Sequence, residues 1–304
     1  MSPRAIRIVA LSLLFCATAL AQSEIMPEIG RVGLTINSRA TGSADAKLKS
    51  GNTTYDQVEI SSFEFGLAQT FRFGQGRMVR LSLERQRTAI DQNRDPGDAV
   101  VPLPDKLNSL AGSVVYTHIV NPRWILTGRV GAGSYVTDTG LLSEGWAVST
   151  MAMAIYNHSQ TLTYIFGLGY NSNLEDLRIL PIFGLNWRPA PQWSVAVGIP
   201  RTAVSYHFNK ELSLSLALSG GGGAYYVKND PLPGAAPRSL ADTRLQQREL
   251  RLGVDASWKI NKVVRVSGAI GHVLYRKFKY QDRDFELKSD SFVPFASVSG
   301  MFSF

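Results

Sequence analysis

The chain has 304 residues, of which 44% are hydrophobic and 18% charged, and its formal net charge is +8 at pH 7. After the N-terminal leader, no apolar run approaches the ~20 residues that a transmembrane helix needs, which excludes a helical membrane protein. The positive charge is not gathered into a Lys/Arg cluster, so we expect no nucleic-acid partner.

Residues 1–21 have the pattern of a secretory signal peptide. Arg4 and Arg7 precede an apolar run from Ile8 to Leu20, and Ala19-Leu20-Ala21 places small residues at a cleavage site. The alternative of a membrane anchor is weaker, because the run is shorter than the ~20 residues that span a bilayer. We therefore expect the chain to be exported and the leader to be cleaved.

Cleavage after Ala21 predicts a mature chain without cysteine. Cys16 is the only cysteine of the sequence and lies inside the leader, and the bulky Phe15 before it argues against lipidation. The mature protein then cannot rely on disulfides, although an oxidising compartment would permit them. We expect residues 22–29 to form a short periplasmic segment and residues 30–304 to form a single β-domain.

From residue 30 onward, apolar side chains recur at every second position. Successive side chains of a strand point to opposite faces, so a wall between lipid and a polar interior produces this period. The clearest stretch is 249–260, and the same pattern covers 79–84, 161–170, 193–199 and 212–219. A soluble β-sandwich also alternates, but the long stretches and the small residues on the polar face favour a membrane barrel.

Short polar turns and longer connections follow one another along the chain. We expect the short turns at Gly74–Arg77, Asn121–Arg123, Asn157–Gln160, Pro189–Gln192, Asn209-Lys210 and Asn261-Lys262. We expect the longer connections at about 40–57, 91–106, 138–145, 171–177, 227–246 and 279–289. Outer-membrane barrels have this asymmetry, with tight periplasmic turns and long outer loops.

One further outer turn, at Pro200-Arg201, decides the number of strands. With it the sequence predicts an all-β, transmembrane, antiparallel up-and-down barrel of about 14 strands, with both termini in the periplasm. If the segment 192–208 folds inward instead, the number is 12. A barrel of either size leaves room for water, side chains or an infolded loop.

Charged residues on the polar face of the strands are candidates for the lumen lining. They number eight basic and four acidic residues: Glu64, Arg72, Arg80, Glu84, Arg129, Arg178, Arg188, Glu249, Arg251, Asp255, Lys259 and Arg265. This excess predicts a preference for anions in an open channel. Alternatively the charges pair, as Glu249 with Arg251 and Asp255 with Lys259, and fill a closed interior.

The connection 227–246 contains several prolines and follows a run of glycines. It either folds over the mouth of the barrel or remains a surface loop. The run Gly220–Gly223 lies inside a strand pattern and not before a helix, so it does not have the context of a phosphate-binding loop. We interpret these glycines as a bend or a place of close approach.

Catalytic and metal sites are not predicted. The trio Asn157-His158-Ser159 places a histidine beside a serine, but adjacent strand residues point apart and the trio falls in an expected periplasmic turn. The other histidines, His118, His207 and His272, have no metal-type spacing. We expect no enzyme activity, no cofactor and no metal.

The last strand, Phe292–Phe304, alternates small or apolar with polar residues and ends on Phe304. Counting back by twos places Phe302 on the lipid face, and closure requires this strand to pair with the first strand near Val32–Ile36. We expect Phe302 and Phe304 to act as a barrel-assembly signal. The leader, the alternation throughout 30–304 and this ending resemble an uncharacterised family of Gram-negative outer-membrane β-barrels.

That resemblance implies the compartment and the partners. It implies the cell outer membrane, contact with outer-membrane lipid and lipopolysaccharide, and insertion by the barrel-assembly machinery. Two functional hypotheses remain open. The first is a passive channel or porin for small solutes, anions in particular, with a mildly basic lumen. The second is a closed barrel with a structural or surface-binding role through its extracellular loops.

Overall fold

The computed structural model describes residues 32–93, 95–138, 140, 143–174, 178–199, 201–236 and 238–304. The expected leader (1–21) and the segment 22–29 lie outside the described residues. Among the described residues no helix is long and apolar enough to cross a membrane.

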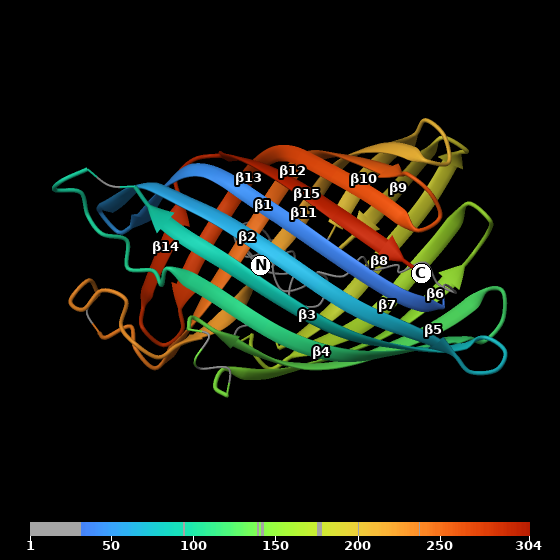
Figure 1. The fold of residues 1–304 in the computed structure, drawn as a ribbon, viewed down its shortest axis with the longest axis horizontal. Coiled ribbons are helices and arrows are strands. Elements are labelled where there is room, and N and C mark those ends of the chain that lie inside the picture. Colours follow the sequence, from blue (N-terminus) through green and yellow to red (C-terminus); the bar gives the residue numbers. More distant parts are fainter. Residues whose placement is uncertain are drawn as a thin grey trace, which may run out of the picture.

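The described chain forms one antiparallel sheet that closes on itself (Figure 1). Its strands are β1 (Gly33–Ser50), β2 (Thr53–Arg72), β3 (Arg77–Gln92), β4 (Lys106–Ile119), β5 (Trp124–Val136), β6 (Trp146–Asn157), β7 (Leu162–Asn171), β8 (Ile179–Ala190), β9 (Trp193–Gly198), β10 (Arg201–His207), β11 (Leu212–Val227), β12 (Thr243–Lys259), β13 (Val264–Tyr280), β14 (Phe285–Ser289) and β15 (Val293–Ser303). Each strand up to β13 pairs with the next one along the chain.

β14 and β15 occupy one position in the barrel. Both pair with β13 on one side and with β1 on the other, and they are separated only by residues 290–292. The fifteen segments therefore make a closed barrel of fourteen strand positions. This confirms the larger of the two expected numbers, and the alternative of twelve strands is wrong.

All the expected short turns lie at one end of the barrel, which we call the turn end. The connections there are 73–76, 120–123, 158–161, 191–192, 208–211 and 260–263. The opposite end, which we call the loop end, carries the connections 93–105, 137–145, 172–178 and 228–242. Pro200, in the expected turn between β9 and β10, lies outside the described residues.

Two of the expected long loops are strands instead. The segment 40–57 forms the β1–β2 hairpin, whose turn is Gly51-Asn52, with Gly51 at φ 57°. β-Bulges on either side of Ala46 shift the register, which hides the period of two in the sequence. The segment 279–289 is likewise paired, because β13 continues to Tyr280 and β14 begins at Phe285.

The barrel closes where β15 meets β1. Nine residue pairs run from Thr35 opposite Ser303 to Ser43 opposite Phe295, as the terminal alternation predicts. The backbone N–H of Phe304 donates a hydrogen bond of 2.9 Å to the Leu34 carbonyl. The C-terminus and the start of β1 thus lie together at the turn end (Figure 1).

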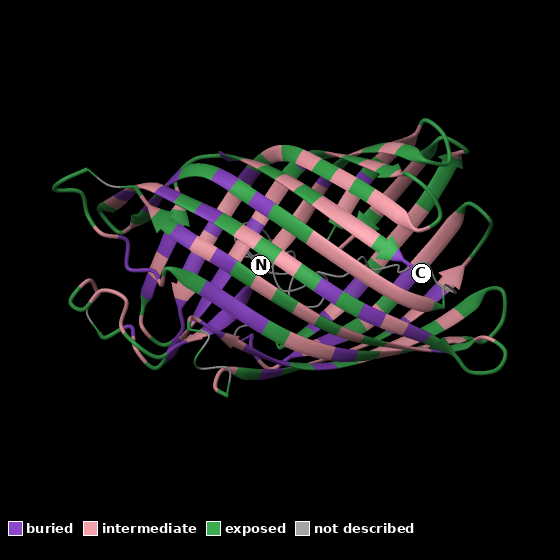
Figure 2. Cartoon of the chain, viewed as in Figure 1, coloured by how far each residue is buried: buried purple, intermediate pink, exposed green. Residues whose placement is uncertain are grey.

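The outward face of the barrel is apolar and the inward face is largely polar. Exposed and less exposed residues alternate along the strands (Figure 2), and exposed residues include Leu216, Val254, Phe183 and Val298. Along β12 the outward side chains from Leu250 to Trp258 are apolar. Eight steps of ~3.3 Å on a strand tilted by ~40° make a band of about 20 Å, close to the ~25 Å of membrane barrels.

Four tryptophans mark the turn end of this band. Trp124, Trp187, Trp193 and Trp258 are 39–55% exposed and lie at or near strand ends. Trp124 packs against Tyr156 with ring centroids 4.7 Å apart. Such rings favour the headgroup level of a bilayer, where one edge of the ring is hydrated.

Candidate functional site: the lumen and its closed mouth

Described residues line two neighbouring cavities in the interior of the barrel. The first, about 250 Å³, is lined mainly by β1–β6 and reaches Thr35, Thr70 and Ser303 close to the turn end. The second, about 460 Å³, is lined mainly by β8–β12 and by the middle of β1 and β2. Five residues line both: Arg39, Glu64, Gln86, Gly222 and Tyr225. The cavities are therefore neighbouring parts of one lumen.

Basic side chains outnumber acidic ones in this lining. Seven inward-facing arginines stand against three glutamates: Arg39, Arg80, Arg129, Arg201, Arg251, Arg265 and Arg276, and Glu64, Glu84 and Glu249. A fourth carboxylate, Asp255, forms an ion pair with Arg201. Even with this carboxylate included, the lumen keeps a surplus of positive charge.

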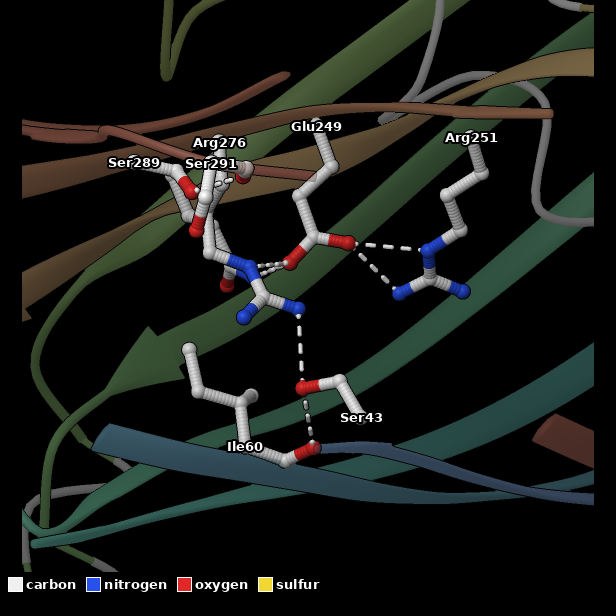
Figure 3. Close-up of polar contacts among 8 residues, drawn as sticks. Ser43, Ile60, Glu249, Arg251, Arg276, Ser289 and Ser291 are labelled. Atoms are coloured by element: carbon white, nitrogen blue, oxygen red, sulfur yellow. Dashed lines mark hydrogen bonds and ion pairs between the residues drawn. The ribbon is translucent and has the colours of Figure 1, made fainter. Parts of the chain in front are cut away.

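The most deeply buried charges surround Glu249 on β12 (Figure 3). The Glu249 carboxylate is 1% exposed and accepts hydrogen bonds from Arg276 Nε at 2.7 Å, Arg251 Nε at 2.9 Å and Gln247 Nε2 at 2.8 Å. Arg276 Nη2 donates to Ser43 Oγ at 3.2 Å, and Ser43 Oγ donates to the Ile60 carbonyl. The cluster joins β12 and β13 to β1 and β2 through the interior.

This cluster carries one more positive than negative charge. A buried carboxylate is stabilised only when it is paired and hydrogen-bonded, and two guanidinium groups supply that here. Arg276 is itself 1% exposed, and its Nη1 has no hydrogen-bond partner in the described part of the chain. A buried donor without a partner costs about 1–3 kcal/mol, so an acceptor in the cavity would stabilise it.

The loop end is closed by apolar side chains that point inward. This mouth cluster comprises Leu48, Tyr55, Val58, Ile60, Ile90, Val101, Leu103, Leu107, Tyr225, Val227, Leu240, Leu245, Phe278, Tyr280, Phe285 and Leu287, each at most 8% exposed. Strands supply most of it, and the loops 93–105 and 228–242 add Val101, Leu103 and Leu240. The connection expected at 227–246 therefore folds over the mouth.

Hydrogen bonds hold the two loops in place. In the 93–105 loop, the Gln92 amide accepts from Val101 N at 2.9 Å, and Tyr280 Oη donates to the Pro102 carbonyl at 2.7 Å. In the 228–242 loop, which we call the lid, Arg283 donates to the Ala241 carbonyl at 3.0 Å. An ion pair of 2.9 Å joins Lys228 to Glu144 and raises the pKa of the Lys228 ammonium.

The β11–β12 hairpin bends across the mouth to bring the lid into place. β11 pairs at Tyr226 with Val136 of β5, although these strands belong to opposite walls. The bend follows Gly222, whose φ is +140°, and a Cβ there would stand 2.1 Å from the Gln247 carbonyl oxygen. The two interpretations of Gly220–Gly223, a bend and a place of close approach, are thus both confirmed.

Seven of the expected lumen residues line a cavity. Arg80, Glu84, Arg129 and Arg265 line the first cavity, Glu249 and Arg251 line the second, and Glu64 lines both. Lys259 stands opposite Arg265 near the turn end, and Arg72, Arg178 and Arg188 are exposed.

The two expected charge pairs have different outcomes. The pair between Glu249 and Arg251 is confirmed, with Oε2 and Nη2 2.6 Å apart. The expected pair between Asp255 and Lys259 is wrong, because Asp255 pairs with Arg201 of β10. Residues four apart on one strand are separated by about 13 Å, which is too far for a direct ion pair.

The sequence pattern does not identify three arginines of the lumen. Arg201 falls in the expected turn at Pro200-Arg201. Arg276 lies beyond the bulge in which β13 skips Leu274, so the alternation of inward and outward side chains is reversed there. Arg39 could have been found, because it stands opposite Ser299, which the terminal alternation already places inside.

A serine and a histidine lie close together in the structure, but they are not those of Asn157-His158-Ser159. His158 and Ser159 lie exposed in the 158–161 turn. On neighbouring strands, Ser194 Oγ lies 2.9 Å from His207 Nε2 at the turn end. Among the described residues no three His, Cys, Asp or Glu side chains are placed to hold a metal ion.

Three solved structures are among those similar to this chain. The outer-membrane channel COG4313 from Pseudomonas putida F1 is 14% identical, with 92% of this chain and 100% of that chain covered and a TM-score of 0.47. The translocator domain of the autotransporter NalP from Neisseria meningitidis is 12% identical, with 99% and 97% covered and a TM-score of 0.41. The KdgM porin, solved with disordered oligogalacturonate, is 9% identical, with 89% and 99% covered and a TM-score of 0.37.

No curated protein matches the chain in sequence. One family model matches residues 44–292, which is most of the barrel. Its description gives no function, in agreement with the resemblance to an uncharacterised family. The chain belongs to the family described as a domain of unknown function, DUF6268.

Proposed function

We propose that this protein is an outer-membrane channel for small solutes, with a lumen that favours anions and a mouth that is closed in this conformation. The surplus of arginines over carboxylates in the lumen lining carries the proposal. Fixed charges of one sign along a water-filled path raise the local concentration of counter-ions. A barrel with a purely structural interior has no need of this imbalance, because equal numbers of opposite charges would fill it.

The orientation in the membrane follows from the unequal ends. Short turns and both ends of the described chain lie at the turn end, so we place that end in the periplasm and the lid outside. The partners in this proposal are the lipid and lipopolysaccharide around the apolar band, and the assembly machinery that inserts the barrel. The proposal includes no enzyme activity and no cofactor.

The mouth cluster is the observation that favours a second candidate. Sixteen buried apolar residues at the loop end would suit a closed barrel that presents its loops to a surface partner. The two candidates differ in whether the mouth opens. A channel requires the β11–β12 hairpin to lift away from β5, whereas a closed barrel keeps it in place.

Bilayer conductance of a shortened hairpin separates the candidates. Gly223 and Gln247 are paired, so residues 224–246 can be replaced by a two-residue Asn-Gly turn without changing the register. This variant loses Tyr225, Val227, Leu240 and Leu245 from the mouth cluster. We expect brief conductance steps from the wild type, persistent steps from the variant, and a reversal potential that reports anion preference.

A sealed bilayer would contradict the channel proposal. The variant must first show the change in electrophoretic mobility on heating that marks a folded barrel. If the folded variant does not conduct, the lumen is not a path for ions and the closed barrel is supported. Cation preference in the conducting variant would contradict the role assigned to the arginines.

A further inference from the structure

The wall of the barrel is interrupted between β8 and β11. β9 and β10 have only six and seven residues, and their pairing with the neighbouring strands stops at Gly184 of β8 and Ser219 of β11. Beyond that level, residues 179–183 of β8 have no strand partner on this side within the described chain. The end of β11 turns inward to β5 instead. We call this gap the window.

The window opens at the depth of the membrane. On β8, exposed apolar side chains continue from Trp187 at the turn end past the window's edge to Phe183 and Ile179, which are 63% and 64% exposed. The tip of β9 at Gly198 is five residues from Trp193. On a strand tilted by ~40°, these five residues rise by roughly 13 Å along the membrane normal. The gap therefore faces hydrocarbon. Unpaired backbone at this depth is tolerated where it lines a cavity.

The second cavity runs from this window to the Glu249 cluster. Its lining includes Phe183, Leu185 and Val197, whose side chains belong to the outward face of the wall. Further in, the walls are apolar at Ile182 and Phe295, and Arg251 lies over the Phe295 ring at 5.5 Å. Its volume of about 460 Å³ is within the ~300–1,000 Å³ of small-molecule sites.

The inner end of the cavity is suited to an anionic head group. Arg276 lines the cavity and is only 1% exposed. Its Nη1 has no hydrogen-bond partner in the described chain. Ser43 and Gln247 line the cavity beside it. The cluster of Arg251, Arg276 and Glu249 carries a single surplus positive charge, which matches a monoanion.

We propose that the second cavity binds an amphiphilic organic monoanion, a carboxylate with an apolar body, which passes between the lumen and the membrane through the β8–β11 window. The carboxylate accepts from the guanidinium of Arg276, which lines the cavity, and the apolar body lies along Ile182 and Phe295 toward Phe183. This inference deepens the proposed function, because it assumes that the lumen is a solute site. It gives the solute a lateral route that does not require the mouth to open.

Photolabelling tests the site directly. The probe is dodecanoate with a diazirine at its apolar end, applied to the full mature barrel in lipid nanodiscs, with the labelled residues identified by mass spectrometry. We expect saturable labelling of residues around the window. Unlabelled dodecanoate should compete about tenfold or more better than dodecan-1-ol, because a hydrogen bond to a charged group is worth ~1.5–3 kcal/mol.

Two pairs of variants separate the head-group site from the window. Arg276→Gln should weaken saturable labelling about tenfold or more, whereas Arg265→Gln removes an arginine of the first cavity and should leave it unchanged. The mature chain expected after cleavage has no cysteine, so single thiols can be introduced. Val197→Cys modified with pyrene maleimide should block labelling. Leu83→Cys, exposed on β3 and several strands from β8 and β11, should not when modified in the same way.

Two results would overturn the inference. One is label spread evenly over the outward apolar band. The other is labelling that stays the same both in Arg276→Gln and when the window is blocked. If Arg276→Gln does not fold, the thiol pair alone decides, because both of its positions lie on the exposed face. The outcome is independent of conductance. If the bilayer stays sealed but specific labelling is observed, only the channel proposal is contradicted. If the protein conducts but shows no specific labelling, only this inference is contradicted.

Discussion

Replacement of Glu249 by glutamine tests the arrangement of charge inside the barrel. The substitution keeps the shape of the side chain and removes its charge. Arg251 and the 1%-exposed Arg276 would then face each other without the carboxylate that accepts from both. Loss of one partner from a buried ion pair costs about 3–5 kcal/mol, and full burial of Glu249 leaves little solvent to screen the remaining charges.

Urea unfolding of the purified barrel in lipid vesicles, followed by tryptophan fluorescence, measures this cost. We expect the midpoint for Glu249→Gln to move to a lower urea concentration. Glu84→Gln is the matched control, because the Glu84 side chain is 34% exposed and its oxygen is 4.0 Å from Arg129. A partly hydrated pair of this kind contributes about 0–1 kcal/mol.

A double variant distinguishes charge from packing. Glu249→Met together with Arg276→Met removes both members of the buried pair, and apolar replacements of this kind are often neutral. We expect the double variant to be more stable than Glu249→Gln. If Glu249→Gln unfolds within about 1 kcal/mol of the wild type, the two arginines do not depend on the carboxylate and the reasoning fails.

Three further predictions concern assembly, the bend and selectivity. Deletion of Phe304, a residue that is 65% exposed, should lower the amount of barrel inserted in cells and leave the unfolding midpoint in vitro nearly unchanged. An equal loss in both assays would contradict a signal role. Gly222→Ala should cost about 1–3 kcal/mol in the same unfolding assay, because the φ of residue 222 is +140°. Gly221→Ala should be tolerated, because its added Cβ would lie 3.9 Å from the Glu249 Cβ. Equal effects of the two substitutions would show that the bend is not strained. In the shortened-hairpin channel, Arg39→Glu should move the reversal potential toward cations. Arg87→Glu should not, because Arg87 is exposed on the outward face opposite Phe63; equal shifts would mean that ions do not pass the lumen.

Most of the barrel was predictable because lipid imposes a period of two. Each of the expected short turns is present, and the pairing of the last strand with the first follows from the alternation that ends on Phe304. The errors occur where the alternation is interrupted. The bulges around Ala46 made a hairpin look like a loop, and the bulge in β13 turned Arg276 inward against the local parity.

The site was only partly predictable, because the local sequence does not show which side chains meet across the lumen. The sequence identifies charged residues on inward faces, but which of them meet depends on strand tilt and on the bend at Gly222. Arg201 reaches Asp255 from another strand, and Arg276 reaches Ser43 from the far end of the chain. The mouth cluster was missed for the same reason, since its loop residues Val101, Leu103 and Leu240 carry no periodic signal.

The break between β14 and β15 divides the closing seam into two parts of unequal length. Nine pairs join β1 to β15, whereas only two pairs, at Leu48 and Lys49, join β1 to β14 beyond the break. Cooperative units of different stability open on different timescales. The amide protons of β14 should therefore exchange with solvent while those of β15 remain protected, and the outer rim of the barrel can fluctuate without opening the membrane-embedded wall.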